Sequence, residues 1–116
     1  MGRLAGLLAQ EEELAQAPVV LATRELTEAE RRVLPLAQVE AREQRVEAAL
    51  IMAHVARESS FNPRATHRDV DGKFSYGLMQ LRLATAREVV GDPSLPPEAL
   101  FDPALNVKLG TRYIAR

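Results

Sequence analysis

Residues 46–63 read VEAALIMAHVARESSFNP, and we start from this segment because it indicates a core helix. From Val46 to Ala56 nearly every position is apolar, whichever face of a helix it falls on. A helix that is apolar all round is buried all round, so we expect this segment to be the central helix of the core. It should end before Pro63, because a residue that precedes proline does not easily stay helical. A charge at Ala53 is accordingly expected to unfold the domain, since an unpaired buried charge is strongly destabilising.

The size and charge of the chain restrict its class. Its 116 residues suit one domain, and 47% hydrophobic with 27% charged residues is an ordinary globular composition. Lys and Arg number 15 against 16 Asp and Glu, so the basic excess of a nucleic-acid-binding protein is absent. With no cysteine, a disulfide framework, a thiolate metal site and a cysteine nucleophile are all excluded. We expect no nucleic-acid partner.

The first residues do not resemble an export signal. Their apolar stretch is short and runs directly into Glu11–Glu13. No apolar run approaches the roughly 20 residues that a membrane span requires. We therefore expect neither an ordinary secretory signal nor a membrane span in this chain.

The chain divides into an arm and a domain. Residues 1–24 are predicted to form a helical arm, in which Leu4, Leu7, Leu8 and Leu14 give one apolar face. The domain is predicted to occupy residues 25–116.

Local signals place the other elements. Thr27 followed by Glu30 is a capping-box pattern that should start a helix. Residues 66–76 are polar and contain glycine, which favours a short hairpin or an irregular loop, and the pattern from 77 to 90 favours a helix with an irregular opening. Asp102 before Pro103 predicts the start of a last helix.

Glu58 is the first candidate for chemistry. It falls at the C-terminal end of the apolar helix, where both desolvation and the helix dipole disfavour a charged carboxylate. That position favours the protonated form, which a general acid requires. The alternative is a glutamate that leaves the core and points to water, and Arg57 beside it could pair with it and act in the opposite sense.

Two motifs together resemble a known family. Residues 58–63 read ESSFNP and residues 75–80 read SYGLMQ. Further matches follow at Thr85-Ala86, Asp102-Pro103, Asn106, Leu109-Gly110 and Tyr113. The ordered set resembles the lytic transglycosylase (SLT) domain of the lysozyme-like superfamily over about residues 46–116. The resemblance implies a mainly α-helical, lysozyme-like fold.

The resemblance also implies an activity. The family cleaves the β-1,4 bond between N-acetylmuramic acid and N-acetylglucosamine in peptidoglycan and needs no cofactor. By this resemblance Glu58 is the single catalytic acid and base, and the product carries a 1,6-anhydromuramyl end, in contrast to the two-carboxylate scheme of ordinary glycosidases. The substrate-binding residues implied are Ser59, Ser75, Tyr76, Gly77, Met79 and Gln80. Local capping by the serines and core filling by Met79 are the structural alternatives.

The loop that contains Asp69 and Asp71 leaves a second reaction open. The related g-type lysozymes hydrolyse the bond and carry aspartates in this region. An aspartate about 6.5–9.5 Å from Glu58 could position a water for hydrolysis, whereas the alternative is a polar turn. A metal site is not expected, because His54 and His67 lack a recognised ligand motif and the Asp69-Val70-Asp71-Gly72 string is incomplete as a calcium loop.

The family pattern continues beyond the last helix of this chain, which predicts an incomplete cleft. We expect the isolated chain to be weakly active or inactive, and self-association or a partner chain to use the arm or the incomplete cleft face. A helical virion or assembly module with a vestigial site is the alternative from another class. The site of action is expected to be the cell wall or periplasm, reached by virion delivery or as part of a larger protein.

Overall fold

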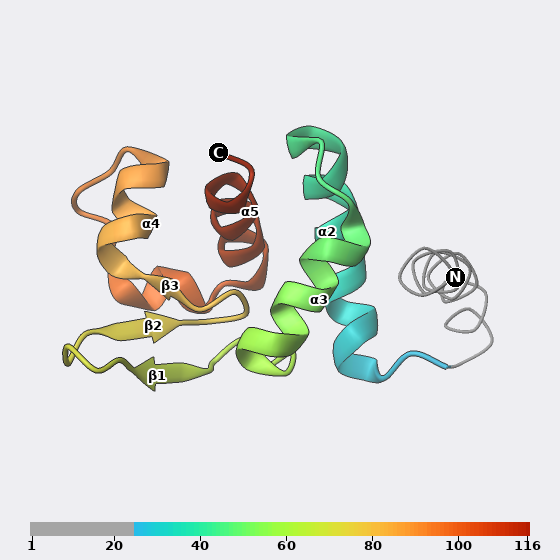
Figure 1. Cartoon of the computed structure of the whole chain (residues 1–116), viewed down its shortest axis with the longest axis horizontal. Helices are drawn as coiled ribbons and strands as arrows, with labels where there is room; N and C mark the ends of the chain where they lie inside the picture. The colour runs from blue at the N-terminus through green and yellow to red at the C-terminus, as the bar shows by residue number, and fades with distance from the viewer. Residues whose placement is uncertain (1–24) are drawn as a thin grey trace, which may run out of the picture.

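The computed structural model describes residues 25–116, which form a mainly α-helical fold with one small sheet (Figure 1). The expected arm, residues 1–24, lies outside the described residues. The elements in chain order are α2 (Glu28–Gln44), α3 (Ala48–Ser59), β1 (Thr66–Arg68), β2 (Phe74–Tyr76), β3 (Leu81–Arg82), α4 (Leu83–Val90), the 3₁₀ helix η1 (Pro97–Phe101) and α5 (Pro103–Ile114). Among the helices in this range, none is long and apolar enough to cross a membrane.

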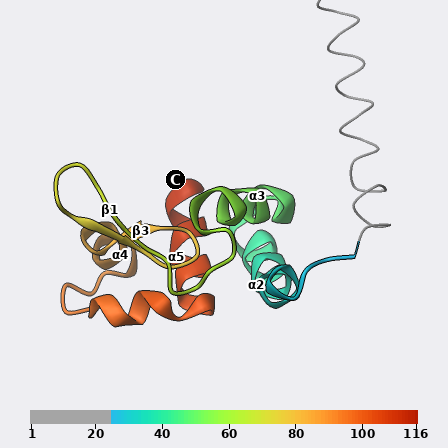
Figure 2. The ribbon, with the colours of Figure 1, turned by 90° about the horizontal axis from the view of Figure 1, so that it is seen from below.

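Helix α5 lies between two halves of the fold, with α2 and α3 on one side and the sheet and α4 on the other (Figures 1 and 2). Each half has its own apolar cluster. The first contains Val33, Ala37, Ile51, Val55, Leu78, Met79 and Val107, and the second contains Leu81, Ala86, Leu95, Leu100 and Leu109. Because α5 contributes Val107 to one cluster and Leu109 to the other, it fixes the two halves against each other.

The predicted start signals of α2 and α5 are both confirmed. The Glu30 backbone N–H donates to Thr27 Oγ1 at 3.1 Å, and the Thr27 N–H donates to Glu30 Oε1 at 2.9 Å, so the capping box is complete. At α5 the Asp102 carboxylate accepts from the Leu105 N–H at 2.9 Å. These caps orient the two helices that pack most extensively against each other.

The expectation of a helix buried on every side is wrong for α3. Only Ile51 and Val55 are buried, whereas Leu50 is 57% exposed and Ala53 is also exposed. Within the described residues, α3 packs mainly on α2 and one face of the first cluster, so its other face meets no covering element. The expected unfolding by a charge at Ala53 therefore has no structural basis.

The short sheet is antiparallel in the order β1-β2-β3, which confirms the hairpin expected over residues 66–76. His67 pairs with Ser75 on β2, and Ser75 pairs in turn with Arg82 on β3. The helix favoured over residues 77–90 begins only at Leu83, because residues 77–80 form a turn and the next two residues form β3. This register brings three polar side chains into one row across the sheet.

Candidate active site

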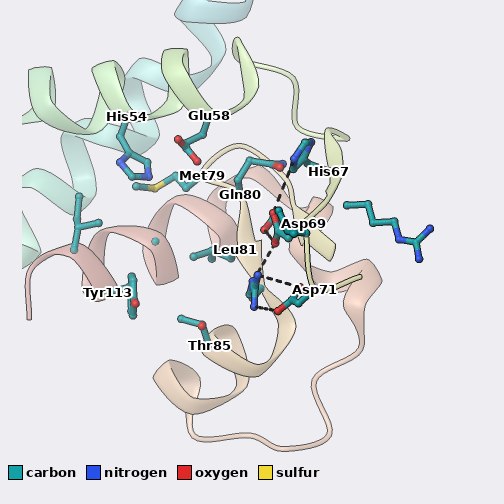
Figure 3. A pocket seen from close by; sticks show the side chains of 16 residues that line it. His54, Glu58, His67, Asp69, Asp71, Met79, Gln80, Leu81, Thr85 and Tyr113 are labelled. Atoms are coloured by element: carbon teal, nitrogen blue, oxygen red, sulfur yellow. Dashed lines mark hydrogen bonds and ion pairs between the residues drawn. The ribbon is translucent and has the colours of Figure 1, made fainter. Parts of the chain in front are cut away.

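An open cleft of about 820 Å³ lies between α3, the sheet and α5 (Figure 3). It is lined by His54 and Glu58 of α3, by residues 67–71 and Ser75 of the hairpin, by residues 79–82, by Thr85 of α4, and by Gly110, Tyr113 and Ile114 of α5. The cleft therefore has carboxylates on two facing sides, one from a helix and two from the hairpin.

Glu58 occupies the last turn of α3, and its side chain is 32% exposed. His54 precedes it by one helical turn, so both side chains reach the cleft from the same face of α3 (Figure 3). Arg57 Nε donates to Glu58 Oε2 at 3.4 Å from a side chain that is 77% exposed. Such an exposed pair is weak, so Glu58 stays available to a ligand in the cleft.

The two hairpin aspartates share one cation, Arg82. Its Nε donates to Asp69 Oδ2 at 3.0 Å, and its two terminal nitrogens donate to the two Asp71 oxygens at 2.8 and 3.2 Å. Ser75 Oγ also donates to Asp69 Oδ2, at 3.0 Å, and His67 Nε2 lies 4.0 Å from Asp69 Oδ1. The row across the sheet therefore converges on Asp69 (Figure 3).

Hydrogen bonds also determine the ionisation of Asp71. The backbone N–H of Lys73 contributes most to holding the pKa of Asp71 below its usual value; burial opposes it, and the Arg82 guanidinium adds to the lowering. The same carboxylates raise the pKa of Arg82, with Asp71 as the larger contributor. Asp71 is therefore stabilised as the anion, and Arg82 as the cation.

The turn of residues 77–80 is tied to the rest of the fold by Asn106, which is fully buried. Asn106 Oδ1 accepts from the Met79 N–H at 2.8 Å, and its Nδ2 donates to the Tyr76 and Leu100 carbonyls, each at 2.9 Å. Gly77 is required here twice over, because its φ is +78° and a Cβ would overlap Asn106 Nδ2 and the Leu100 carbonyl.

The turn presents two side chains to the cleft. Met79 is 2% exposed and packs so closely on α5 that a Cβ at Gly110 would overlap its sulfur. Gln80 Nε2 donates to the Ala65 and Gly77 carbonyls, at 3.1 and 2.9 Å. In the described part of the chain no group donates to Gln80 Oε1, which leaves that oxygen free to accept from a ligand hydroxyl.

Most of the site residues predicted from the sequence meet in this cleft, which Glu58, Asp69, Asp71, Ser75, Met79 and Gln80 all line. The other three are placed elsewhere among the described residues. Ser59 Oγ donates to the Val55 carbonyl at 3.1 Å, the Tyr76 ring packs edge-on against Phe101 at 5.9 Å, and Gly77 supports the turn. These positions match structural roles, and a sugar contact by any of the three stays a prediction.

The site residues predicted from the sequence did not include His54, Arg82, Thr85 or Tyr113, which also line the cleft. His54 could have been found from its spacing of one helical turn before Glu58. Arg82 carries no comparable local signal, because its position depends on the β2–β3 register. Across residues 25–116 no group of three or more His, Asp or Glu side chains is arranged to hold a metal ion.

Comparisons with known proteins agree with this geometry. The family model described as the transglycosylase SLT domain matches residues 35–116. The membrane-bound lytic murein transglycosylase C of Yersinia enterocolitica is 42% identical over 87 residues, and that of Serratia proteamaculans is 39% identical over 89 residues. Each alignment covers 71% of this chain and 23% of the relative.

A solved structure extends the comparison to the fold. The lytic transglycosylase Slt of Pseudomonas aeruginosa, in an inactive variant with glutamine in place of a glutamate, matches with a TM-score of 0.59 and 30% identity. The match covers 70% of this chain and 13% of that one. The expected mainly α-helical, lysozyme-like fold is thereby confirmed, and the chain spans less than a quarter of the length of the relatives it matches.

Proposed function

The chain belongs to the transglycosylase SLT family, and on this basis we propose that it cleaves the β-1,4 bond between N-acetylmuramic acid and N-acetylglucosamine in peptidoglycan. The observation that carries the proposal is the position of Glu58, which lies on the cleft wall at the end of α3 with only a weak, exposed ion pair. The solved relative whose glutamate-to-glutamine variant is inactive supports a glutamate as the essential group.

Glu58 acts as both acid and base in the proposed reaction. Its carboxylic acid donates a proton to the glycosidic oxygen while the bond between that oxygen and the muramyl C1 breaks. The C6 hydroxyl oxygen of the same sugar bonds to C1, and its proton passes to the Glu58 carboxylate. The acid form is regenerated, a 1,6-anhydro ring closes, and no water is consumed.

Other cleft residues bind and orient the glycan strand. Gln80 Oε1 accepts from a sugar hydroxyl, since its amide nitrogen is already held by two backbone carbonyls. Met79 provides an apolar surface at the base of the cleft. Tyr113, which is 49% exposed on α5, offers a ring against which a pyranose can pack.

A hydrolase is the second candidate, because Asp69 and Asp71 line the same cleft as Glu58. A second carboxylate on the far side of the sugar could deprotonate a water in an inverting hydrolysis. Either reaction would take place at the bacterial cell wall. The relatives are named membrane-bound, and we infer that this chain reaches the wall as part of a larger protein or by virion delivery.

The test is digestion of purified peptidoglycan sacculi by the 116-residue chain, by Glu58→Gln and by Glu43→Gln. Glu43 is an exposed glutamate of α2 outside the cleft, so its variant controls for the loss of a surface carboxylate. Mass spectrometry of the soluble fragments should detect anhydromuramyl ends with the wild type and Glu43→Gln, at the low yield expected of an incomplete cleft. Glu58→Gln should release at least about 10²-fold fewer of these ends, because a general acid contributes a factor of about that size.

Three outcomes would oppose the proposal. Equal release by Glu58→Gln would remove Glu58 from the chemistry. Wild-type products with reducing ends alone would establish the hydrolase. No release by the wild type, even at high enzyme concentration, would refute glycan cleavage by this chain alone and would match the inactivity expected of an incomplete cleft.

A further inference from the structure

The strongest unassigned feature of the cleft is the pairing of Arg82 with both hairpin aspartates. All three of its hydrogen-bonding nitrogens donate to carboxylate oxygens, at 2.8 to 3.2 Å. Arg82 is a residue of β3, where it lies directly across from Ser75. The planar guanidinium carries several N–H donors in a fixed geometry that matches carboxylate oxygens. Its pairing with two carboxylates therefore fixes the orientation of all three side chains.

This pairing restricts what the two carboxylates can do. Both oxygens of Asp71 accept from Arg82, and one of them also accepts from the Lys73 N–H at 3.1 Å. Asp69 Oδ2 accepts from both Arg82 and Ser75. A general base must accept a proton from water and keep it. A carboxylate that charged donors stabilise as the anion holds a proton poorly.

The remaining oxygen, Asp69 Oδ1, faces the His67 imidazole. His67 Nε2 is 4.0 Å away, and Arg68 follows His67 on the same wall of the cleft. Asp71 is further stabilised as an anion by the charge of Lys73. No other carboxylate in the described residues lines the cleft except Glu58. The carboxylates of this cleft that could act as a second base, Asp69 and Asp71, are therefore both paired with Arg82.

We propose that Arg82 is a positioning residue that selects the product of the reaction: by holding Asp69 and Asp71 it prevents them from activating water, and the muramyl C6 hydroxyl attacks C1 instead. This inference rests on the proposed glycan cleavage. With Arg82 in place, the C1–O4 bond breaks, C1–O6 forms, and the C6 hydroxyl proton goes to Glu58. Without Arg82, a water oxygen bonds to C1 and its proton goes to a freed aspartate, which gives a reducing end.

The experiment compares product ends from sacculi digested by the wild-type chain, Arg82→Gln, Arg82→Lys and Arg42→Gln. Arg42 is an exposed arginine of α2 outside the cleft, and its variant controls for lost positive charge. The ratio of reducing to anhydromuramyl ends should rise about tenfold or more in Arg82→Gln, because a positioned base accelerates proton transfer roughly 10²–10⁴-fold. The ratio for Arg82→Lys should lie between those of the wild type and Arg82→Gln. A lysine ammonium can pair with one carboxylate but lacks the paired, planar donors of a guanidinium.

A double variant identifies the freed base. Adding Asp69→Asn to Arg82→Gln should return the ratio toward wild type if Asp69 is the base, and adding Asp71→Asn should do so if Asp71 is. A merely structural role of Arg82 would lower total turnover in Arg82→Gln and leave the ratio of product ends unchanged, which would overturn the inference. If the glutamine variant proves poorly folded, Arg82→Lys alone tests the inference, because its ratio of reducing to anhydromuramyl ends should exceed that of the wild type.

A titration tests the inference without turnover. Carboxyl ¹³C NMR of the wild type and of both Arg82 variants should give a higher pKa for Asp71 once the guanidinium is removed, because its hydrogen bonds and charge favour the anion. An unchanged Asp71 titration would overturn the inference. Wild-type products with reducing ends alone would instead refute the proposed transglycosylase reaction, so the two failures are distinguishable.

Discussion

Replacement of Asn106 by leucine should destabilise the fold more than any other single polar substitution on α5. Asn106 is fully buried and makes three hydrogen bonds that join the 77–80 turn, η1 and α5. Leucine has nearly the same volume but no polar atom, so the change removes the bonds without opening a large cavity. The Met79 N–H and the Leu100 carbonyl would then be buried without a partner.

The expected magnitude follows from these groups. A buried polar group that loses its partner costs about 1–3 kcal/mol. With two groups left unpaired and the Tyr76 carbonyl losing one of its bonds, the free energy of unfolding should fall by about 3–5 kcal/mol. The free energy of unfolding of a small domain is about 5–15 kcal/mol, so the variant should be marginally folded.

The assay is urea unfolding followed by far-ultraviolet circular dichroism. Asn106→Asp provides a second perturbation, because it keeps the acceptor for the Met79 N–H and places a carboxylate against two carbonyl oxygens. It should be at least as destabilising, since a buried charge with one oxygen against two carbonyl oxygens is costly. Asn62→Ala is the matched control, because its side chain makes one exposed hydrogen bond, to the Arg64 N–H at 3.0 Å, and should cost under about 1 kcal/mol.

The reasoning would be refuted by a leucine variant within about 1 kcal/mol of the wild type at an unchanged dependence on urea. That result would mean that the turn finds other partners for its backbone groups. It would also mean that Met79 and Gln80 are held in the cleft by something other than Asn106.

Two further predictions concern α3 and the hairpin. Ala53→Glu should change the free energy of unfolding by no more than about 0.5 kcal/mol, because Ala53 is exposed, whereas Ile51→Ala on the buried face should lower it by about 2–5 kcal/mol, both measured by urea unfolding. Asp71 should stabilise the fold in a pH-dependent manner, because the Lys73 N–H and Arg82 lower its folded pKa. The difference in stability between the wild type and Asp71→Asn should be full above the unfolded pKa of about 3.9 and should disappear as the pH falls through the lower folded value. A difference that persists in strong acid would count against this assignment.

Local patterns in the sequence were sufficient for the features that depend on near neighbours. The capping box at Thr27, the cap at Asp102 and the 66–76 hairpin each involve residues a few positions apart, and all three are present. The motifs around Glu58 and Gln80 placed both residues in one cleft. The burial of α3 could not be predicted in this way. An apolar composition shows which surfaces can be buried but not how many elements pack against them.

The position of Arg82 shows why the chemistry of the hairpin carboxylates could not be deduced in the same way. Arg82 is 13 residues from Asp69 along the chain, and it meets that aspartate only because β3 pairs with β2 in the register that sets Arg82 across from Ser75. A slip of one residue would turn the side chain to the opposite face of the sheet. The Asp-x-Asp sequence is therefore compatible with a free base and with a held anion, and the choice depends on a non-local pairing. If Arg82 selects the product as proposed, the identity of the residue at this strand position, rather than the presence of the aspartates, separates the cyclising reaction from hydrolysis.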